Sequence, residues 1–173
     1  MKKIILLTLL FLFNEISFAQ LNISKIREAT FKGDLRSFSY AGNKLYLVGY
    51  NLGVISFVNK STDLGITWED VSGNFSSGDN LTAISFATEN IGLVGGSSGV
   101  IYRTSDGGNT WTNVSPTSVY NGGINYIVML NEQLAYACGA SNGGFNVIKS
   151  TDGGVTWNGV NTSNSNTMYK MYW

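Results

Sequence analysis

Hydrophobic and polar positions between residues 81 and 114 predict four short β-strands. Polar and apolar residues alternate from Leu81 to Ala87, and an apolar stretch runs from Ile91 to Gly95. Two further stretches follow, from Val100 to Ser105 and from Thr110 to Val114, and glycine, serine and asparagine lie between them. Short alternating or apolar stretches bounded by such residues are typical of strands joined by tight turns. We therefore expect one four-stranded antiparallel unit here.

The same pattern recurs on both sides of this unit. Residues 47–55 have the spacing of residues 93–101, with Leu-Val-Gly at the start and Gly-Val-Ile at the end of each. A third copy is looser, because residues 139–146 lengthen one hairpin. Residues 168–173 resemble the first strand of a fourth copy. The chain after its N-terminal segment is thus predicted to be one repeating unit without a linker.

An octapeptide of the form [Ser/Thr]-x-Asp-x-Gly-x-Thr-Trp occurs in each of the three copies, at residues 61–68, 104–111 and 150–157. The aspartates are 43 and then 46 residues apart, at positions Asp63, Asp106 and Asp152. A basic residue precedes each octapeptide, and a valine follows each tryptophan by three residues. A repeat of about 40 to 50 residues is typical of β-propeller blades that have four strands each.

Each residue of the octapeptide has a physical role in a tight β-hairpin. We expect the aspartate to accept hydrogen bonds from backbone N–H groups one or two residues ahead. The glycine two places after it is expected to take a positive φ that a side chain would resist, at positions Gly65, Gly108 and Gly154. The tryptophan is expected to be buried against the neighbouring sheet, at positions Trp68, Trp111 and Trp157.

This octapeptide resembles the Asp box, also called the BNR repeat. Asp boxes occur in sialidases, in xyloglucan-type glycosidases, in sortilin-type receptor propellers and in the photosystem II assembly and stability factor family. The run from Ile91 to Trp111 looks most like a blade of the last family, and the resemblance extends over roughly residues 35–173. It implies an all-β fold, a β-propeller of four-stranded antiparallel blades. It also implies that the Asp box is a structural turn remote from the ligand site.

The length of the chain allows about three blades plus a partial one, at about 45 residues per blade. Closed propellers generally have about four to eight blades. We therefore expect an incomplete propeller, whose remaining blades belong to a longer chain. Association of two or three copies to close a ring is the alternative. Because stacked repeats need neighbours on both sides, the segment alone is expected to be marginally stable or to self-associate.

Residues 1–19 are predicted to be a signal peptide. Lys2 and Lys3 precede an apolar run from Ile4 to Phe13, and small residues lead up to a cleavage site after Ala19. Cleavage there leaves a propeller segment at residues 20–173 and predicts export to the periplasm, the cell surface or the medium, with no membrane span. A run of about ten apolar residues is too short to span a bilayer, so a retained anchor is the weaker alternative.

Composition excludes several classes of function. Charged residues make up 13% of the chain, and lysine plus arginine equal aspartate plus glutamate at 11 each. This balance provides no basic surface for nucleic acid or an anionic membrane. The sequence has no histidine, which excludes Ser/His and Cys/His nucleophile pairs and the commonest zinc ligand. Cys138 is the single cysteine, so no intramolecular disulfide forms. No cofactor or metal is expected.

A glycosidase would need two carboxylates about 5 to 10 Å apart. The carboxylates outside the Asp boxes are expected to be solvated charges in loops or at strand ends: Glu28, Asp34, Glu69, Asp70, Asp79, Glu89 and Glu132. Sialidases bind the carboxylate of their substrate with three arginines. The chain after residue 19 also has three arginines: Arg27, Arg36 and Arg103. Arg103 occupies the repeat position of Lys60 and Lys149, so we interpret it as a blade residue. No catalytic residue is therefore predicted.

The loops opposite the Asp boxes are the expected ligand site, because strands run up and down within a blade. Aromatic side chains in these loops are candidates to stack on a sugar or to fill a pocket of a protein partner: Tyr50, Tyr120 and Phe145. We interpret the chain as a secreted, non-catalytic binding or assembly scaffold for a protein or a glycan. The alternative is a fragment of an exo-acting, sialidase-like glycosidase that lacks most of its active site.

Overall fold

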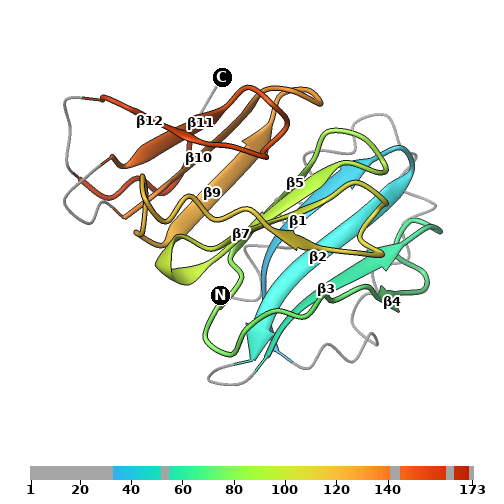
Figure 1. Cartoon of the computed structure of the whole chain (residues 1–173). Coiled ribbons are helices and arrows are strands. Elements are labelled where there is room, and N and C mark those ends of the chain that lie inside the picture. The colour runs from blue at the N-terminus through green and yellow to red at the C-terminus, as the bar shows by residue number, and fades with distance from the viewer. Residues whose placement is uncertain (1–32, 52–54, 141–144, 163–165, 172–173) are drawn as a thin grey trace.

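The computed structural model describes residues 33–51, 55–140, 145–162 and 166–171, which are coloured in Figure 1. These residues form three four-stranded antiparallel sheets, one for each sequence repeat. In every sheet the strands are neighbours in the order in which they follow along the chain. This arrangement confirms the predicted all-β architecture of four-stranded blades. The signal peptide predicted at residues 1–19 lies outside the described residues, as do Arg27 and Glu28.

We call the three sheets blades 1, 2 and 3. Blade 1 consists of β1 (Asp34–Ala41), β2 (Lys44–Asn51), β3 (Ile55–Ser61) and β4 (Glu69–Asp70). Blade 2 consists of β5 (Ala83–Phe86), β6 (Gly92–Gly95), β7 (Ile101–Thr104) and β8 (Thr112–Asn113), with the short 3-10 turn η1 (Ser97–Gly99) between β6 and β7. Blade 3 consists of β9 (Ile124–Met129), β10 (Ala135–Gly139), β11 (Val147–Ser150) and β12 (Asn158–Val160). The four strands predicted between residues 81 and 114 are therefore present, each somewhat shorter than its hydrophobic pattern.

Two hydrophobic clusters fill the spaces between successive blades. The cluster between blades 1 and 2 includes Tyr46, Val58, Leu81, Phe86 and Val94. The cluster between blades 2 and 3 includes Leu93, Ile101, Ile124, Ile127 and Ile148. The first strand of each blade contacts the first strand of the next, β1 with β5 and β5 with β9. The blades therefore pack face to face in chain order (Figure 1). The core of this protein is thus a series of junctions between blades, as a propeller requires.

Serine side chains on the first strands also join successive blades. Ser39 Oγ accepts a hydrogen bond from the Phe86 N–H at 2.9 Å, and Ser85 Oγ accepts one from the Met129 N–H at 2.9 Å. Each bond runs from one blade to the next, at the edge of a sheet where the N–H has no strand partner on that side. The hydroxyls therefore satisfy backbone donors that burial would otherwise leave unpaired.

The register of blade 1 differs from the one that sequence spacing suggests. The repeated Leu-Val-Gly aligns Leu47 with Leu93, but in the sheets Leu45 and Gly92 each lie opposite the first residue of the octapeptide. This pairing places Tyr46 at the position of Leu93. A shift of one residue turns a strand side chain to the opposite face of the sheet. Tyr46 accordingly packs towards blade 2, as Leu93 packs towards blade 3.

Residues 166–171 continue along blade 3 in the manner of a further repeat. The Met168 N–H donates to Gly139 O at 3.0 Å, as the Ile124 N–H donates to Gly96 O at 2.9 Å. Met168 O accepts a hydrogen bond from Asn125 Nδ2 at 3.0 Å. This agrees with the prediction that a fourth repeat begins here, although the segment is not a regular strand and residues 172 and 173 lie outside the described part. Among the described residues, no helix has the length and apolar character needed to cross a membrane.

Candidate functional site

The Asp-box turns are closed by hydrogen bonds from the threonine of the octapeptide. In the first turn, Asp63 Oδ1 accepts from the Thr67 N–H at 2.8 Å and Asp63 Oδ2 accepts from the Thr67 hydroxyl at 2.6 Å. Asp63 Oδ1 also accepts from the Ser61 hydroxyl at 2.8 Å, and Ser61 Oγ accepts from the Gly65 N–H at 2.8 Å. The expectation of acceptors for N–H groups one or two residues ahead is therefore wrong. The carboxylate reaches four residues ahead and closes the whole turn.

The second and third turns repeat these contacts. Thr110 donates to Asp106 from its N–H at 2.9 Å and from its hydroxyl at 2.6 Å. Thr156 donates to Asp152 in the same way, at 2.9 and 2.5 Å. The glycines have φ values of 88°, 87° and 88°, which confirms the predicted positive φ at Gly65, Gly108 and Gly154. The residue before each glycine also has a positive φ, and in the first turn this residue is Leu64 with φ 58°.

Hydrogen bonds in the turns lower the pKa values of the three carboxyl groups. Bonds from the Thr67 hydroxyl and N–H lower the pKa of Asp63 from 3.8 to about 2. Partial burial opposes the shift at Asp152, but bonds from Thr156 lower its pKa to about 2. The pKa of Asp106 is lowered by bonds from Thr110 against the same opposing effect of burial. These groups are ionised acceptors at neutral pH, which suits a turn and does not suit a general acid.

The turns are therefore expected to weaken in acid. Because the folded pKa values lie below the unfolded value, their stabilising contribution is present above about pH 4 and is lost as the pH falls towards about 2. Thermal unfolding followed by circular dichroism should show the Asp152→Asn variant melting below the unsubstituted protein near pH 6. The difference should shrink as the pH falls, because Asn does not titrate. If the difference in melting temperature between the two proteins stayed constant over this pH range, the lowered pKa of the turn carboxylate would be contradicted.

The three tryptophans of the octapeptides have different surroundings. Trp157 is buried, with 5% of its surface exposed, whereas Trp111 and Trp68 are half-buried. Trp111 Nε1 donates to Val71 O of blade 1 at 2.9 Å, so this indole joins two blades. Trp68 Nε1 donates within its own turn to Gly65 O at 3.2 Å. The buried Trp157 Nε1 has no hydrogen-bond partner in the part of the chain that the structure describes. Burial was correctly predicted at Trp157 and only partly at the other two.

The Asp-box turns lie on the same face as the hairpins between the first two strands of each blade. The Gly107 N–H donates to Asn90 O at 2.9 Å, and the Gly153 N–H donates to Gln133 O at 2.8 Å. Arg103 Nε donates to Gly153 O at 3.0 Å and so connects blade 2 to the turn of blade 3. Arg103 is therefore a blade residue, as its place in the repeat predicts. The remaining loops must lie on the opposite face, because strands alternate in direction.

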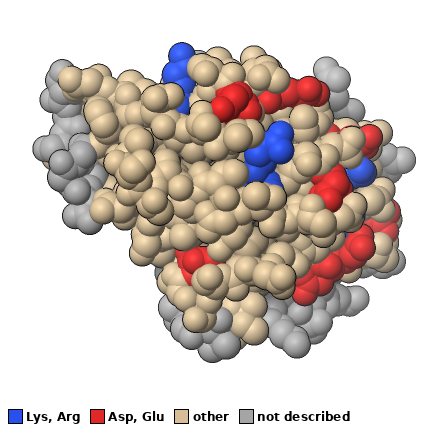
Figure 2. All heavy atoms as spheres, viewed as in Figure 1, with Lys and Arg blue, Asp and Glu red and all other residues tan. Residues whose placement is uncertain are grey.

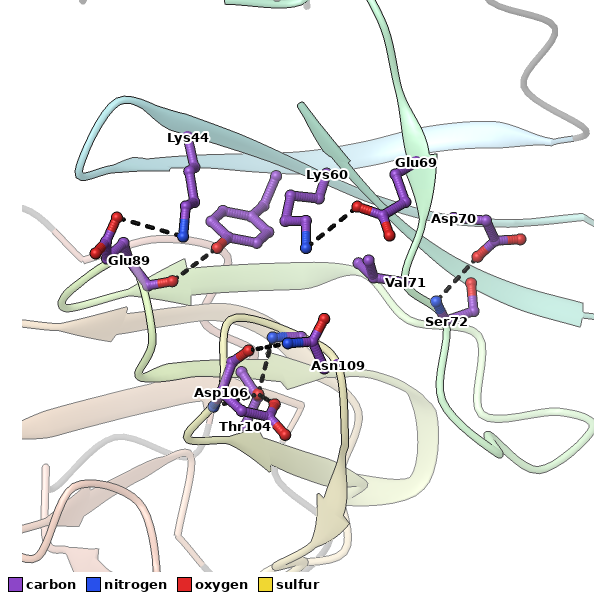
Figure 3. A network of polar contacts seen from close by, with 12 residues as sticks. Lys44, Lys60, Glu69, Asp70, Val71, Ser72, Glu89, Thr104, Asp106 and Asn109 are labelled. Carbon is purple, nitrogen blue, oxygen red and sulfur yellow. Dashed lines mark hydrogen bonds and ion pairs between the residues drawn. The ribbon is translucent and has the colours of Figure 1, made fainter. Parts of the chain in front are cut away.

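Two carboxylates near the Asp boxes are held in ion pairs. Lys44 Nζ lies 3.3 Å from Glu89, and Lys60 Nζ lies 3.3 Å from Glu69, as Figure 3 shows beside the Asp106 turn. The face in Figure 2 is mostly uncharged, and most of its acidic side chains lie towards the right. Within the described ranges, no cluster of three or more Cys, Asp or Glu residues is arranged to hold a metal ion. Glu89 and Glu69 are thus each paired with a lysine.

The loop face is our name for the surface opposite the Asp boxes, formed by the described parts of residues 71–82, 96–100, 114–123 and 140–146 with the adjoining strand ends. Tyr50 lies at its edge, at the end of β2, and its ring centroid is 4.5 Å from the Arg36 guanidinium carbon. Arg36 Nη2 is also 3.4 Å from Asp34 Oδ2. The pair of Tyr50 and Arg36 is partly exposed, so a cation and an aromatic ring are presented together.

The other two candidate aromatic residues are placed differently from each other. Phe145 is 39% exposed, and its ring lies directly over Gly159, where an added Cβ would be 2.0 Å from Phe145 Cδ2. Tyr120 is only 3% exposed, and its hydroxyl shares its one proton between Gly123 O at 3.1 Å and Ala140 O at 2.9 Å. The structure corrects the expectation for Tyr120, because a buried ring with a fully used hydroxyl offers no surface to a ligand.

Asp79 is not the solvated charge that its sequence context suggests. It is 7% exposed, and its carboxylate accepts hydrogen bonds from the Ser76 N–H and the Tyr102 hydroxyl, both at 2.7 Å. Burial and the contact with Asp79 raise the pKa of Tyr102. Sequence reasoning missed this role, since it depends on a tyrosine in the next blade. Among the described carboxylates at this end of the strands, Asp79 accepts two hydrogen bonds, Asp34 pairs with Arg36, and Asp70 at the end of β4 accepts from the Ser72 N–H at 2.9 Å.

Comparisons with known proteins agree with this geometry. Residues 37–172 match the family model described as photosynthesis system II assembly factor YCF48. No curated protein matches the chain. Among solved structures, YCF48 bound to a D1 peptide is 23% identical over 75% of this chain with a TM-score of 0.62, and YCF48 from Cyanidioschyzon merolae is 22% identical over 75% with a TM-score of 0.58.

A glycosidase propeller is similar as well. The GH74 enzyme of Niastella koreensis is 26% identical over 83% of this chain, with a TM-score of 0.58. The chain spans 41% and 38% of the two YCF48 structures and 24% of the GH74 structure. These similarities establish the fold of the blades, and they do not identify a ligand of this chain.

Proposed function

Because the chain belongs to the photosynthesis system II assembly factor YCF48 family, we propose that it is a non-catalytic propeller scaffold whose loop face binds a peptide segment of a partner protein. Two findings support this proposal. A YCF48 structure similar to this chain is bound to a D1 peptide. In the chain itself, Tyr50 and Arg36 present an aromatic ring and a cation at the edge of the loop face. Export directed by residues 1–19 is part of the same proposal.

The observation that carries the proposal is the contact between Arg36 and Tyr50. A guanidinium stacked on a ring is held in place, and the Arg36 N–H donors that do not bond Asp34 suit peptide carbonyl or carboxylate oxygens. Phe145, half-exposed at the opposite end of the described loops, offers a second apolar contact. Exposed aromatic and arginine side chains are the residue types that contribute most to protein binding.

The GH74 likeness makes a glycosidase the second candidate. A glycosidase requires two carboxylates that are free to act on one bond. On the loop face, Asp79 is buried and hydrogen-bonded, Asp34 is paired with Arg36, and Asp70 accepts a hydrogen bond from the Ser72 N–H. The described residues therefore favour binding over hydrolysis.

Panning of a random peptide library against the purified protein tests the proposal, with soluble xyloglucan as a parallel probe. We expect enriched peptides that bind with saturable affinity by calorimetry, and no release of reducing ends from xyloglucan. The proposal fails if the library yields no saturable binder. Hydrolysis of xyloglucan would instead establish the glycosidase alternative.

A further inference from the structure

The loop that joins blade 1 to blade 2 meets a loop of blade 2 on the loop face. One joins β4 to β5 and includes Ser76 and Asp79, and the other contains η1 between β6 and β7. The Ser97 N–H donates to Asp79 O at 2.7 Å. A Cβ added at Gly96 would lie 2.2 Å from the same oxygen, so a glycine is needed for this close approach. The two loops are therefore in direct backbone contact.

The Asp79 side chain ties this contact to blade 2. Its Oδ2 accepts from the Ser76 N–H within its own loop and from the Tyr102 hydroxyl on β7, both at 2.7 Å. No lysine or arginine forms an ion pair with Asp79 in the described ranges. A buried carboxylate without a cation is costly unless strong hydrogen bonds compensate it, and such bonds to an ionised acceptor are about twice as strong as neutral ones.

We infer that Asp79 is a positioning residue, which holds the β4–β5 and β6–β7 loops as one preformed part of the ligand-binding surface. This inference rests on the proposed function. Loops that are already ordered do not lose conformational freedom when a partner binds, so a preformed surface binds more tightly than a mobile one with the same contacts. The residues that Asp79 holds are small and polar, and their backbone groups keep defined directions because the carboxylate fixes the turn.

The junction between blades 2 and 3 provides a matched comparison. There the Tyr120 hydroxyl donates to Gly123 O and Ala140 O, and so ties the β8–β9 loop to the β10–β11 loop without a charge. Replacing either tyrosine by phenylalanine removes its hydroxyl and keeps its ring. Tyr102→Phe and Tyr120→Phe therefore each remove one side-chain hydrogen bond at equivalent loop pairs, while the backbone bonds from the Ser97 N–H to Asp79 O and from the Ala140 N–H to Gly123 O remain.

The experiment combines hydrogen exchange and peptide affinity on the full chain, for Asp79→Asn, Tyr102→Phe and Tyr120→Phe. The peptide is one selected from the random library on the unsubstituted protein. We expect the first two variants to exchange at least about tenfold faster at residues 76–80 and 97–99, with residues 121–124 and 140 unchanged. Tyr120→Phe should exchange faster at residues 121–124 and 140, with residues 76–80 and 97–99 unchanged. Peptide affinity should fall about tenfold in both Asp79→Asn and Tyr102→Phe, and no further in the double variant, which a general loss of stability would not produce.

The possible failures are distinguishable. Unchanged exchange in the two loops overturns the role of Asp79 without reference to any ligand. Faster exchange with unchanged peptide affinity shows that Asp79 orders the loops but does not position a binding surface, and it overturns the inference. If the unsubstituted protein binds no peptide, the proposed function fails, and the binding role of Asp79 fails with it.

Discussion

Replacement of Trp111 by alanine is expected to lower the free energy of unfolding by about 3 to 5 kcal/mol. Trp111 packs against Gly73, where an added Cβ would be 2.9 Å from its Cδ1, and tilts against Phe75 and Phe86 at centroid distances of 6.0 and 6.2 Å. It also donates its indole N–H to Val71 O. The variant therefore loses both packing and a hydrogen bond between blades 1 and 2. Urea denaturation followed by fluorescence of the remaining tryptophans measures the loss.

Two further substitutions control this measurement. Trp111→Phe keeps an aromatic ring and loses the bond to Val71 O, so its cost should be well below that of alanine and at least about 1 kcal/mol. Thr112→Ala changes the exposed neighbouring position on β8 and should stay within about 0.5 kcal/mol of the unsubstituted protein. If Trp111→Ala cost no more than Thr112→Ala, the indole would not be a contact that joins the blades.

Gly154→Ala is expected to destabilise the protein by about 3 kcal/mol. The backbone at Gly154 has φ 88°, which costs a residue with a side chain about 1 to 2 kcal/mol. In addition, the new Cβ would lie 2.5 Å from Leu93 Cδ2, and Leu93 is fully buried in the cluster between blades 2 and 3. Overpacking of this kind typically costs about 1 to 3 kcal/mol. Denaturation in urea again measures the total.

Gly78→Ala separates the two contributions. Gly78 has φ 92°, close to that of Gly154, but no atom lies within 4 Å of a Cβ added there. Its substitution should cost only the backbone strain, about 1 to 2 kcal/mol. Equal losses for Gly78→Ala and Gly154→Ala would show that the contact between the Asp-box turn and blade 2 adapts to the methyl group.

The parts of the fold that follow from local chemistry were predictable from the sequence. The Asp-box turns repeat because each octapeptide contains its own donors and acceptors, as the bonds between Asp63 and Thr67 show. The positive φ of the glycines has the same local origin. The sequence did not indicate the distance over which the aspartate acts, because several turn geometries suit the same residues.

Features that depend on contacts between blades were not predictable in this way. Tyr120 and Asp79 lie in polar loops, and only the packing of a neighbouring loop or strand makes them buried. The one-residue shift between Tyr46 and Leu93 appears only in the strand pairing, where Leu45 and Gly92 lie opposite the first residue of the octapeptide. Trp111 and Trp157 share one motif, yet only Trp111 Nε1 reaches a carbonyl of the preceding blade. Such differences depend on the surface of the neighbouring blade rather than on the repeated sequence.

The central claim is that the Asp-box turns stabilise the fold, whereas the loop face binds the partner. The most direct test measures melting temperature and affinity for a library-selected peptide on the same samples of Asp106→Asn and Tyr50→Ala. The account predicts that Asp106→Asn melts at a lower temperature with unchanged affinity. It predicts that Tyr50→Ala loses about tenfold in affinity, about 1.4 kcal/mol, with little change in melting temperature. A stable Asp106→Asn variant that no longer binds the peptide would contradict it.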